Sequence, residues 1–264
     1  MDEGMTDTVT SAPAERTITV LTAASPGRGL MLLRAHNSLA HQVLPPGWAW
    51  QWVIQEDAER PSLETLLPKD PRIEFDFNGG HFGPAITRNL ALIRARGGIV
   101  RNLDDDDELA PDALALDIEA FVTHPGLAWV TSEAADVTTH GEIKRHSTPF
   151  PAGPVAAGAL TEAWLLSPER VPPVHPATMC VKTDVLRSLG GWMAMPFSED
   201  TGLLMATASR FPGRHGGHVS LFYHRGPLQV SETQSLKTRE SKSARAALIT
   251  QRIRAMDAVF GRTA

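Results

Sequence analysis

Four short segments in the first half of the chain are rich in β-branched and aromatic residues, as β-strands are. They cover residues 17–22, 50–55 and 73–77 and a run that begins at Ile99 and leads directly into Asp104. Glycine, proline or charged residues follow each segment, as expected where a buried strand reaches the surface. The pattern therefore predicts four strands that each end at a polar loop.

Three amphipathic helices are predicted between or after these strands. Their apolar residues recur at the three- or four-residue spacing of one helix face: Leu32, Ala35 and Leu39 in the first, Ile86, Leu90 and Ile93 in the second, and Leu114, Ile118 and Phe121 in the third. The second helix is expected from about residue 84 to residue 96, with Gly97 and Gly98 as its C-terminal stop. Because strands and helices alternate, the predicted fold class is α/β, with a mostly parallel central sheet and flanking helices.

The second half has a weaker periodic pattern. Seven prolines between residues 149 and 176 predict a stretch that is largely loop. Alternating apolar residues from His218 to His224 predict one further strand. A last helix is predicted from about residue 235 to residue 260, and its basic side chains are Lys237, Arg239, Lys242, Arg245, Arg252 and Arg254. A solvated helix face accounts for these charges, with docking on a lipid surface or a partner, including a second copy in a homodimer, as the alternatives.

Length, net charge and cysteine content limit the classes of protein to which the chain can belong. A chain of 264 residues, 42% of them hydrophobic, can form one large α/β domain with or without a small subdomain. The formal net charge of −5 argues against a nucleic-acid partner, because such proteins carry a positive surplus over the phosphate backbone. The single cysteine, Cys180, excludes an internal disulfide and a cysteine-based zinc site.

The sequence also bears on location. No apolar run reaches the roughly 18 to 20 residues that a membrane-spanning helix needs. Residues 1–16 contain Asp2, Glu3 and Asp7 and have no apolar centre, so they indicate a loose leader and not a signal peptide. A soluble protein in the reducing cytoplasm, without an integral membrane segment, is the simplest expectation.

Five consecutive carboxylates, from Asp104 to Glu108, directly follow the fourth predicted strand. In an open parallel sheet, ligands bind beyond the carboxyl ends of the strands. Adjacent carboxylates repel one another unless a positive charge lies among them, and Mg²⁺ or Mn²⁺ binds through one or two carboxylates together with substrate phosphates. In an extended segment Asp104 and Asp106 would share one side, with Asp105 on the other. A solvated acidic loop or an acidic helix N-terminus is the alternative.

Five segments of the chain follow one another in a characteristic order. They are residues 20–24, 50–57 and 83–89, the run LDDDDELAPDAL from Leu103 to Leu114, and GGWMAMPFSED from Gly190 to Asp200. In this order they resemble family-two glycosyltransferases of the GT-A fold, over about residues 17 to 231. The resemblance implies a GT-A domain at 17–232, with a nucleotide-sugar-binding half (17–125) and an acceptor and catalytic half (126–232), between the leader and a C-terminal helical extension (233–264).

The resemblance implies how the residues divide around a nucleotide-sugar donor, with a UDP-sugar as the first expectation. Thr22 and Asp57 would hold the nucleoside, and Asp105 would face its ribose. Arg88, which is followed by Asn89, would bind the donor phosphates. The cation, Mn²⁺ or Mg²⁺, would bind to the remaining aspartates of the run, which are Asp104, Asp106 and Asp107.

Glu199 and Asp200 resemble the acidic pair that supplies the family's general base, and Asp200 is the predicted base. Displacement at the anomeric carbon inverts its configuration, and the acceptor hydroxyl must lose its proton as it attacks. An acidic pair at a helix N-terminus is the structural alternative. Trp192 would either pack against a sugar in the site or fill the core. His175 would either line the acceptor site or have a structural role.

Two positions depart from the family. Ala24 stands where an aromatic residue often stacks on the base, which leaves the identity of the base open. In the closing stretch, aligned on Gln229 and Ser231, His224 and Gly226 stand where arginine and histidine are usual. The role of His224 therefore stays open.

The leading hypothesis is a metal-dependent, inverting glycosyltransferase that moves a sugar from a nucleoside-diphosphate sugar to a small-molecule or glycan acceptor. A nucleotidyltransferase would share the nucleotide-binding sheet and the acidic metal ligands, but no glycine-rich, lysine-bearing phosphate loop follows the first strand. A catalytically inactive nucleotide-sugar-binding protein is the third alternative, against which the intact aspartate run and Asp200 argue.

Overall fold

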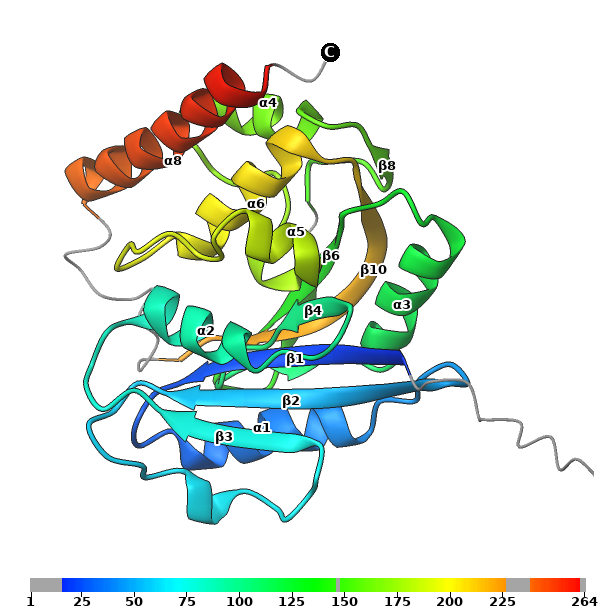
Figure 1. The fold of residues 1–264 in the computed structure, drawn as a ribbon, viewed down its shortest axis with the longest axis vertical. Coiled ribbons are helices and arrows are strands. Elements are labelled where there is room, and N and C mark those ends of the chain that lie inside the picture. Colours follow the sequence, from blue (N-terminus) through cyan, green and yellow to red (C-terminus); the bar gives the residue numbers. More distant parts are fainter. Residues whose placement is uncertain (1–15, 146–147, 227–237, 262–264) are drawn as a thin grey trace, which may run out of the picture.

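The computed structural model describes residues 16–145, 148–226 and 238–261 of the chain. A ten-stranded sheet runs through this part, with helices on both of its faces (Figure 1). The predicted leader lies almost wholly outside the described residues, as do Gln229 and Ser231.

The first half forms the parallel sheet that the alternation of strands and helices predicts. Its strands are β1 (Arg16–Ala24), β2 (Trp48–Glu56), β3 (Ile73–Phe77) and β4 (Ile99–Asn102). Its helices are α1 (Gly29–Ala40), α2 (Pro84–Ile93) and α3 (Ala113–Thr123). In the order β3-β2-β1-β4 every pairing is parallel, so all four strands end at the same edge of the sheet.

The second half extends the sheet with strands of mixed direction. Its elements are β5 (Glu108–Leu109), β6 (Trp129–Val137), β7 (Ile143–Arg145), β8 (Gly153–Val155), α4 (Ala159–Leu166), β9 (Cys180–Lys182), α5 (Thr183–Ser188), α6 (Glu199–Arg210), β10 (Gly213–His224) and α8 (Arg239–Phe260). β10 is parallel to β6, but β9 lies between β4 and β6 and is antiparallel to both. The α/β prediction is confirmed, and parallel pairing is confined to the first half and to β6 with β10.

Alternate residues of the long strands face opposite sides of the sheet, and each side has its own apolar core. Ile18 and Ile54 are buried on the side covered by α1 and α3, where they pack with Leu32. Leu21 and Val53 are buried on the other side, which α2, α4, α5, α6 and α8 cover (Figure 1). The helices therefore cover the faces of the sheet and leave the carboxyl ends of its parallel strands accessible.

α2 turns a different face to the core than its apolar periodicity predicts. Ile86 and Ile93 are 40% and 74% exposed, and Leu90 is only half-buried. The buried residues of α2 are Ala85, Thr87, Arg88, Ala91 and Leu92. Because α2 packs closely on β1 and β2, small residues occupy the contact and one buried arginine reaches past it. The predicted inner stripe is therefore wrong at Ile86 and Ile93.

The predicted glycine stop of α2 is also wrong, because the helix ends at Ile93, before the glycine pair. A Cβ atom at Gly97 would lie 2.6 Å from the carbonyl oxygen of Thr17 and 2.6 Å from the backbone nitrogen of Thr19. Gly97 is thus explained by the close approach of this turn to β1, which a larger residue would prevent.

α4 was not predicted, and α6 was considered only as the alternative that Glu199 and Asp200 lie at a helix N-terminus, where the structure places them. α4 lies within the proline-rich stretch that the sequence assigned to loop. Ten of the twelve residues of α6 are buried. On average the helix is not strongly apolar, and its apolar residues do not form a single stripe. A helix that is enclosed on nearly all sides does not show the amphipathic periodicity by which helices are recognised.

α8 packs against α6 and contributes Ile249 and Ile253 to the same core. Lys242 and Arg254 are exposed, as predicted for a solvated face, but Arg245 is only 8% exposed, so that interpretation is wrong for Arg245. Within the described ranges, no helix combines the length and the apolarity that crossing a bilayer requires.

Candidate active site

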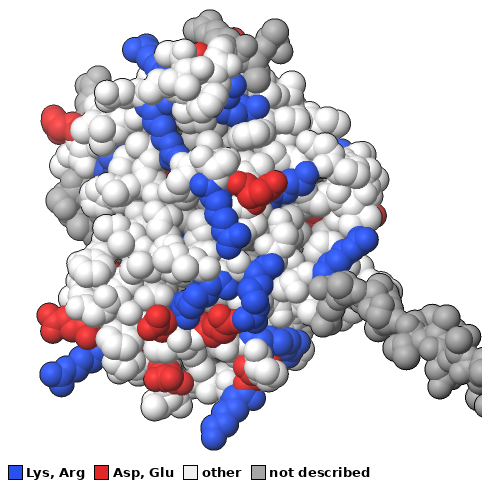
Figure 2. Space-filling view, in the orientation of Figure 1, with Lys and Arg blue, Asp and Glu red and all other residues white. Residues whose placement is uncertain are grey.

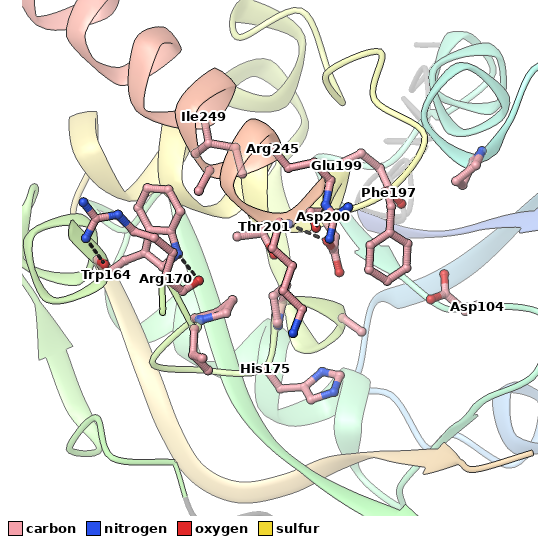
Figure 3. A pocket seen from close by; sticks show the side chains of 18 of the residues that line it. Asp104, Trp164, Arg170, His175, Phe197, Glu199, Asp200, Thr201, Arg245 and Ile249 are labelled. Carbon is pink, nitrogen blue, oxygen red and sulfur yellow. Dashed lines mark hydrogen bonds between the residues drawn. The ribbon is translucent and has the colours of Figure 1, made fainter. Parts of the chain in front are cut away.

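A cleft of about 1490 Å³ opens at the edge of the sheet where β1, β2 and β4 end. One wall, here called the strand-end wall, contains residues 23–25 at the end of β1, Asp57 after β2, and residues 104–106 after β4. The opposite wall, here called the α8 wall, contains Trp164, residues 168–172 and one face of α8. Figure 3 shows Asp104 and Trp164 on opposite sides of the cleft, with the first turn of α6 between them.

Arg28 supplies positive charge within the aspartate run. Its Nη1 atom lies 2.7 Å from Oδ1 of Asp105 and 3.0 Å from Oδ2 of Asp106. The backbone N–H of Ser25 donates to Oδ2 of Asp105 at 2.7 Å, and Arg34 donates to the backbone carbonyl of Asp106 at 2.5 Å. Asp105 is thereby buried against the loop after β1, whereas Asp106 is half-buried in the cleft wall.

The arginines do not fully compensate the acidic loop. Burial, with a contribution from the neighbouring Asp105 and Asp104, raises the pKa of Asp106 to about 6, although Arg28 opposes the rise. Burial likewise raises the pKa of Asp105, again against Arg28. The loop therefore favours the uptake of additional positive charge, either a proton or a cation.

Arg88 joins the aspartate run to the first turn of α6. Its Nη2 atom donates to Oδ1 of Asp104 at 2.5 Å, and its Nη1 atom donates to Oε1 of Glu199. Asn102 also donates to Oδ1 of Asp104, at 3.0 Å. Burial alone would lower the pKa of Arg88, but Asp104 and Glu199 outweigh burial and raise it, so the guanidinium is charged. Two motifs that lie far apart in the sequence are therefore held together by one buried cation.

Asp200 lies beside this ion pair and faces the cleft (Figure 3). Burial and, to a smaller extent, the negative charge of Glu199 raise its pKa to about 7, although Arg88 opposes the rise. The N–H of Thr201 donates to Oδ1 of Asp200 at 2.6 Å, which fixes the orientation of the carboxyl group. A carboxylate that titrates near neutral pH suits a general base, because it is charged at working pH and still basic.

Asp57 is the residue that the end of β2 contributes to the strand-end wall. Its Oδ1 atom accepts from Asn78 Nδ2 at 2.8 Å and from the N–H of Phe82 at 2.6 Å, and its Oδ2 atom accepts from the N–H of Gly83 at 3.0 Å. The carboxylate thus ties the end of β2 to the loop that leads into α2. It lines the cleft as predicted, with both of its oxygens bonded to the protein.

Thr22 and Trp192 do not line this cleft. Thr22 is buried inside the sheet, where its hydroxyl donates to the Leu103 carbonyl at 2.7 Å and accepts from Trp52 Nε1 at 2.8 Å. Trp192 is 4% exposed and packs in the core. Asn89 brackets its backbone with two hydrogen bonds of 2.9 Å. The sequence left open whether Trp192 packs against a sugar or fills the core, and the structure places it in the core.

Asp107 also lies outside the cleft lining, although it belongs to the aspartate run. Its Oδ1 atom accepts from the N–H of His224 at 3.0 Å, and its buried Oδ2 atom has no hydrogen-bond partner among the described residues. Burial raises its pKa well above the ordinary value, and Asp106 adds to the rise. Nε2 of His224 lies 2.6 Å from Oε1 of Glu108, so His224 connects the end of β10 to the acidic loop.

The fit of a divalent cation rests on Asp104 and Asp106, which share the strand-end wall and offer carboxylate oxygens. Among the described residues, no three Asp, Glu, His or Cys side chains are placed to hold a metal by themselves. Two carboxylates and an excess of negative charge fit a hard cation whose remaining ligands come from a bound diphosphate and water. The residues present therefore fit a site that is shared with a substrate.

Residues that the sequence reasoning missed complete the cleft. Arg28 follows the first strand and contacts the acidic run, but it was not among the predicted site residues. Arg245 donates from Nε to Ser198 Oγ at 3.0 Å, and its guanidinium lies 5.1 Å from the centroid of the Phe197 ring. Ser198 has a left-handed backbone (φ 64°) directly before Glu199, so Arg245 braces the turn that presents the acidic pair.

His175 lines the floor of the cleft (Figure 3). Its ring centroid lies 5.1 Å from that of Tyr223, a second lining residue, at an interplanar angle of 58°. Tyr223 comes from the end of β10, so the floor joins the end of β10 to the loop that follows α4.

Comparison with known proteins indicates the family of the chain. Residues 27–181 match the model of glycosyl transferase family 2, which is more than half of the chain. The matched region includes Arg28, Asp57, Arg88 and the aspartate run, but it ends before Glu199 and Asp200. A protein of Escherichia coli (strain K12) that is named a colanic acid biosynthesis glycosyl transferase, WcaA, is 29% identical over 112 residues. That alignment covers 40% of this chain and 38% of the relative's length.

Solved structures share the fold. The crystal structure of residues 1–349 of TarS from S. aureus has a TM-score of 0.61 and 18% identity, covering 79% of this chain and 60% of that one. The same protein in complex with UDP-GlcNAc has a TM-score of 0.62 and 15% identity, covering 92% of this chain and 73% of that one. At these identities the likeness establishes the GT-A fold alone.

Proposed function

Since this chain belongs to glycosyl transferase family 2, we propose that it transfers a sugar from a nucleoside-diphosphate sugar to an acceptor hydroxyl. We propose further that the transfer inverts the anomeric carbon and depends on Mn²⁺ or Mg²⁺. A UDP-sugar is the donor we expect first, because a protein of the same fold has been solved with UDP-GlcNAc.

One observation carries this proposal: a buried arginine joins the aspartate loop to the acidic first turn of α6 within a single cleft. Arg88 contacts both Asp104 and Glu199, and Asp200 faces the same space. A glycosyl transfer needs a site for the leaving diphosphate and a base for the acceptor hydroxyl at one reacting carbon. The Arg88 bridge fixes these two functions relative to each other.

The acceptor oxygen attacks the anomeric carbon of the donor, and the bond from that carbon to the diphosphate oxygen breaks. The acceptor proton passes to the Asp200 carboxylate, and the nucleoside diphosphate leaves with the bonding electron pair. The raised pKa of Asp200, about 7, favours proton acceptance without preventing ionisation at neutral pH. Because there is one displacement, the configuration at the anomeric carbon is inverted.

Asp104 and Asp106 would hold the cation, which stabilises the departing diphosphate as a Lewis acid. We assign no metal contact to Asp107, because its carboxylate is directed to the His224 backbone and lies outside the cleft lining. Asp105 and Arg28 would order the loop that meets the nucleoside, and Asp57 would border the base.

The test is the release of UDP from UDP-GlcNAc, with manganese or magnesium present, by the wild-type chain and by Asp200→Asn. General-base catalysis contributes about 10² to 10⁴ in rate, so we expect a loss of that size in the variant. Affinity for UDP should stay unchanged. The matched control is Asp184→Asn on the exposed start of α5, which should keep full activity.

The alternatives give different products. A nucleotidyltransferase would release pyrophosphate from a nucleoside triphosphate, and an inactive binder would be stabilised by UDP-GlcNAc without releasing UDP. Full UDP release by Asp200→Asn would remove the base from the proposal even if transferase activity is present.

A further inference from the structure

The α8 wall carries basic side chains that the proposed chemistry does not use. α8 contributes Lys242, Arg245 and Arg254 to the lining of the cleft, and the loop after α4 contributes Arg170. Glu169 is the one carboxylate among the described lining residues of this wall. The wall is thus basic although the whole chain has a formal net charge of −5.

Two of these cations are available to a ligand. Lys242 and Arg254 are exposed, and neither forms an ion pair with any residue in the described ranges. Both line the cleft, and they lie twelve residues apart on α8, which separates their Cα atoms by about 18 Å along the helix axis.

Arg170 is held in place at the far end of the α8 wall. Its Nη1 atom donates to the Ser167 carbonyl at 2.9 Å, and its guanidinium lies 5.6 Å from the centroid of a ring of Trp164. Trp164 in turn donates from Nε1 to the Arg170 carbonyl at 2.7 Å. This loop therefore presents a fixed positive charge opposite the aspartate run (Figure 3).

The charges divide the cleft into two environments. The strand-end wall contains Asp104, Asp105 and Asp106, which suit a cation with a diphosphate. The α8 wall has the opposite sign, and Figure 2 shows basic side chains on the upper part of this face, where α8 lies in Figure 1. A neutral acceptor would gain little from such a wall, whereas an anion would be attracted to it and oriented.

We propose that the acceptor carries an oxyanion, a phosphate or a carboxylate, which an exposed cation of the α8 wall, Lys242 or Arg254, binds beside the hydroxyl that attacks. This inference rests on the proposed glycosyl transfer and adds the chemical class of the acceptor. Guanidinium and ammonium groups bind oxyanions through charge-assisted hydrogen bonds, which are stronger than neutral ones. The anion would hold the acceptor on the α8 wall and direct its hydroxyl toward Asp200.

The experiment measures binding to protein that is saturated with UDP and Mn²⁺, so that the donor end of the cleft is filled. The probes are glucose, glucose 6-phosphate and glucuronate, followed by the change in melting temperature with concentration. We expect the two anions to stabilise the protein and glucose to have no effect. In Lys242→Gln/Arg254→Gln the affinity for the anions should fall about tenfold, with UDP affinity unchanged.

The control variant is Lys144→Gln, because Lys144 is 70% exposed and lies on β7, outside the cleft lining. It should bind the anions as the wild type does. Equal binding of glucose and glucose 6-phosphate, or anion binding that the double variant retains, would overturn the proposal. So would binding only to vesicles of phosphatidylglycerol, which would make α8 a lipid-docking helix. Failure to bind UDP at all would instead contradict the proposed function, and the first titration reports it separately.

Discussion

At the scale of single residues, the surroundings of Asp200 determine the pH at which the proposed base is charged. Burial, together with the negative charge of Glu199, raises its pKa to about 7. Below that pH the carboxyl group is protonated and cannot accept the acceptor proton. We therefore expect kcat/KM to increase about tenfold per pH unit up to pH 7 and then to level, as measured by UDP release between pH 5.5 and 8.5.

The residual activity of Asp200→Asn provides the control, because it should lack this acidic limb. A wild-type profile that is flat over the whole range would contradict the assignment of the base.

The raised pKa of Asp200 affects stability in the opposite direction, since it makes the protein less stable as the pH rises. The native protein retains the Asp200 proton between the ordinary value of 3.8 and about 7, where the unfolded chain releases it. The contribution of Asp200 to the free energy of unfolding therefore decreases as pH rises through that window.

Residue types and spacing predicted which acids belong to the site, but not where each side chain points. Asp57, Asp104 and Asp200 line one cleft, although 143 positions separate the first from the last. Thr22 was assigned to the site from the same family resemblance, and yet its side chain lies inside the sheet. Successive side chains of a strand face opposite sides of the sheet. Matching a residue to the correct position of a family motif therefore does not determine to which side its side chain points. Arg28 and Arg245 were missed because their partners are distant in sequence.

At the scale of elements, the contact between α2 and α6 depends on one buried cation. Arg88→Met would leave Asp104 and Glu199 without their shared partner in a buried site. Removing one member of a buried ion pair costs about 3–5 kcal/mol, so urea denaturation should show a loss of that size in the free energy of unfolding. The cleft should also lose affinity for the donor.

A matched arginine near the end of the same helix serves as the control. Arg96 pairs with Glu74, but its side chain is 64% exposed. Exposed pairs contribute about 0 to 1 kcal/mol, so Arg96→Met should change the free energy of unfolding by no more than that. If both arginine variants had the same small effect, the link between α2 and α6 would not be structural.

α8 offers a second test at this scale, because it provides both the core residue Ile253 and the cleft wall. Ile253 is 3% exposed within the core shared with α6, whereas Leu248 is 48% exposed. Ile253→Ala should lower the free energy of unfolding by about 2–5 kcal/mol, and Leu248→Ala should lower it by much less. Equal effects in chemical denaturation would show that α8 is not packed against the core.

The sequence predicted the elements of the first half better than those of the second. The long strands are runs of β-branched and aromatic residues that end at polar loops, and α1 has one buried face, so each has a clear local pattern in the sequence. α6 is enclosed on nearly all sides and β9 has three residues, so neither has room for such a period. The antiparallel insertion of β9 between β4 and β6 depends on tertiary contacts that no local pattern encodes.

At the scale of the whole molecule, donor binding depends on the balance of charge in the cleft. The strand-end wall contains four aspartates, and Arg28 and Arg88 already bond to three of them, Asp104, Asp105 and Asp106. A diphosphate adds further negative charge to a wall where Asp106 has a pKa raised to about 6 by burial and by its acidic neighbours. UDP and the cation should therefore bind cooperatively, each neutralising the repulsion that the other meets.

We expect UDP in the presence of EDTA, and manganese alone, to change the melting temperature little, and the two together to raise it clearly. At a UDP concentration of about one hundred times its Kd, the stabilisation should be about 2.7 kcal/mol. Asp106→Asn should weaken this cooperativity, whereas Asp184→Asn, on the exposed face of α5, should preserve it. Uridine, which lacks the diphosphate, should show no dependence on manganese. Equal stabilisation by UDP with and without EDTA would mean that the arginines alone hold the diphosphate, and the cation would then have no place in the mechanism.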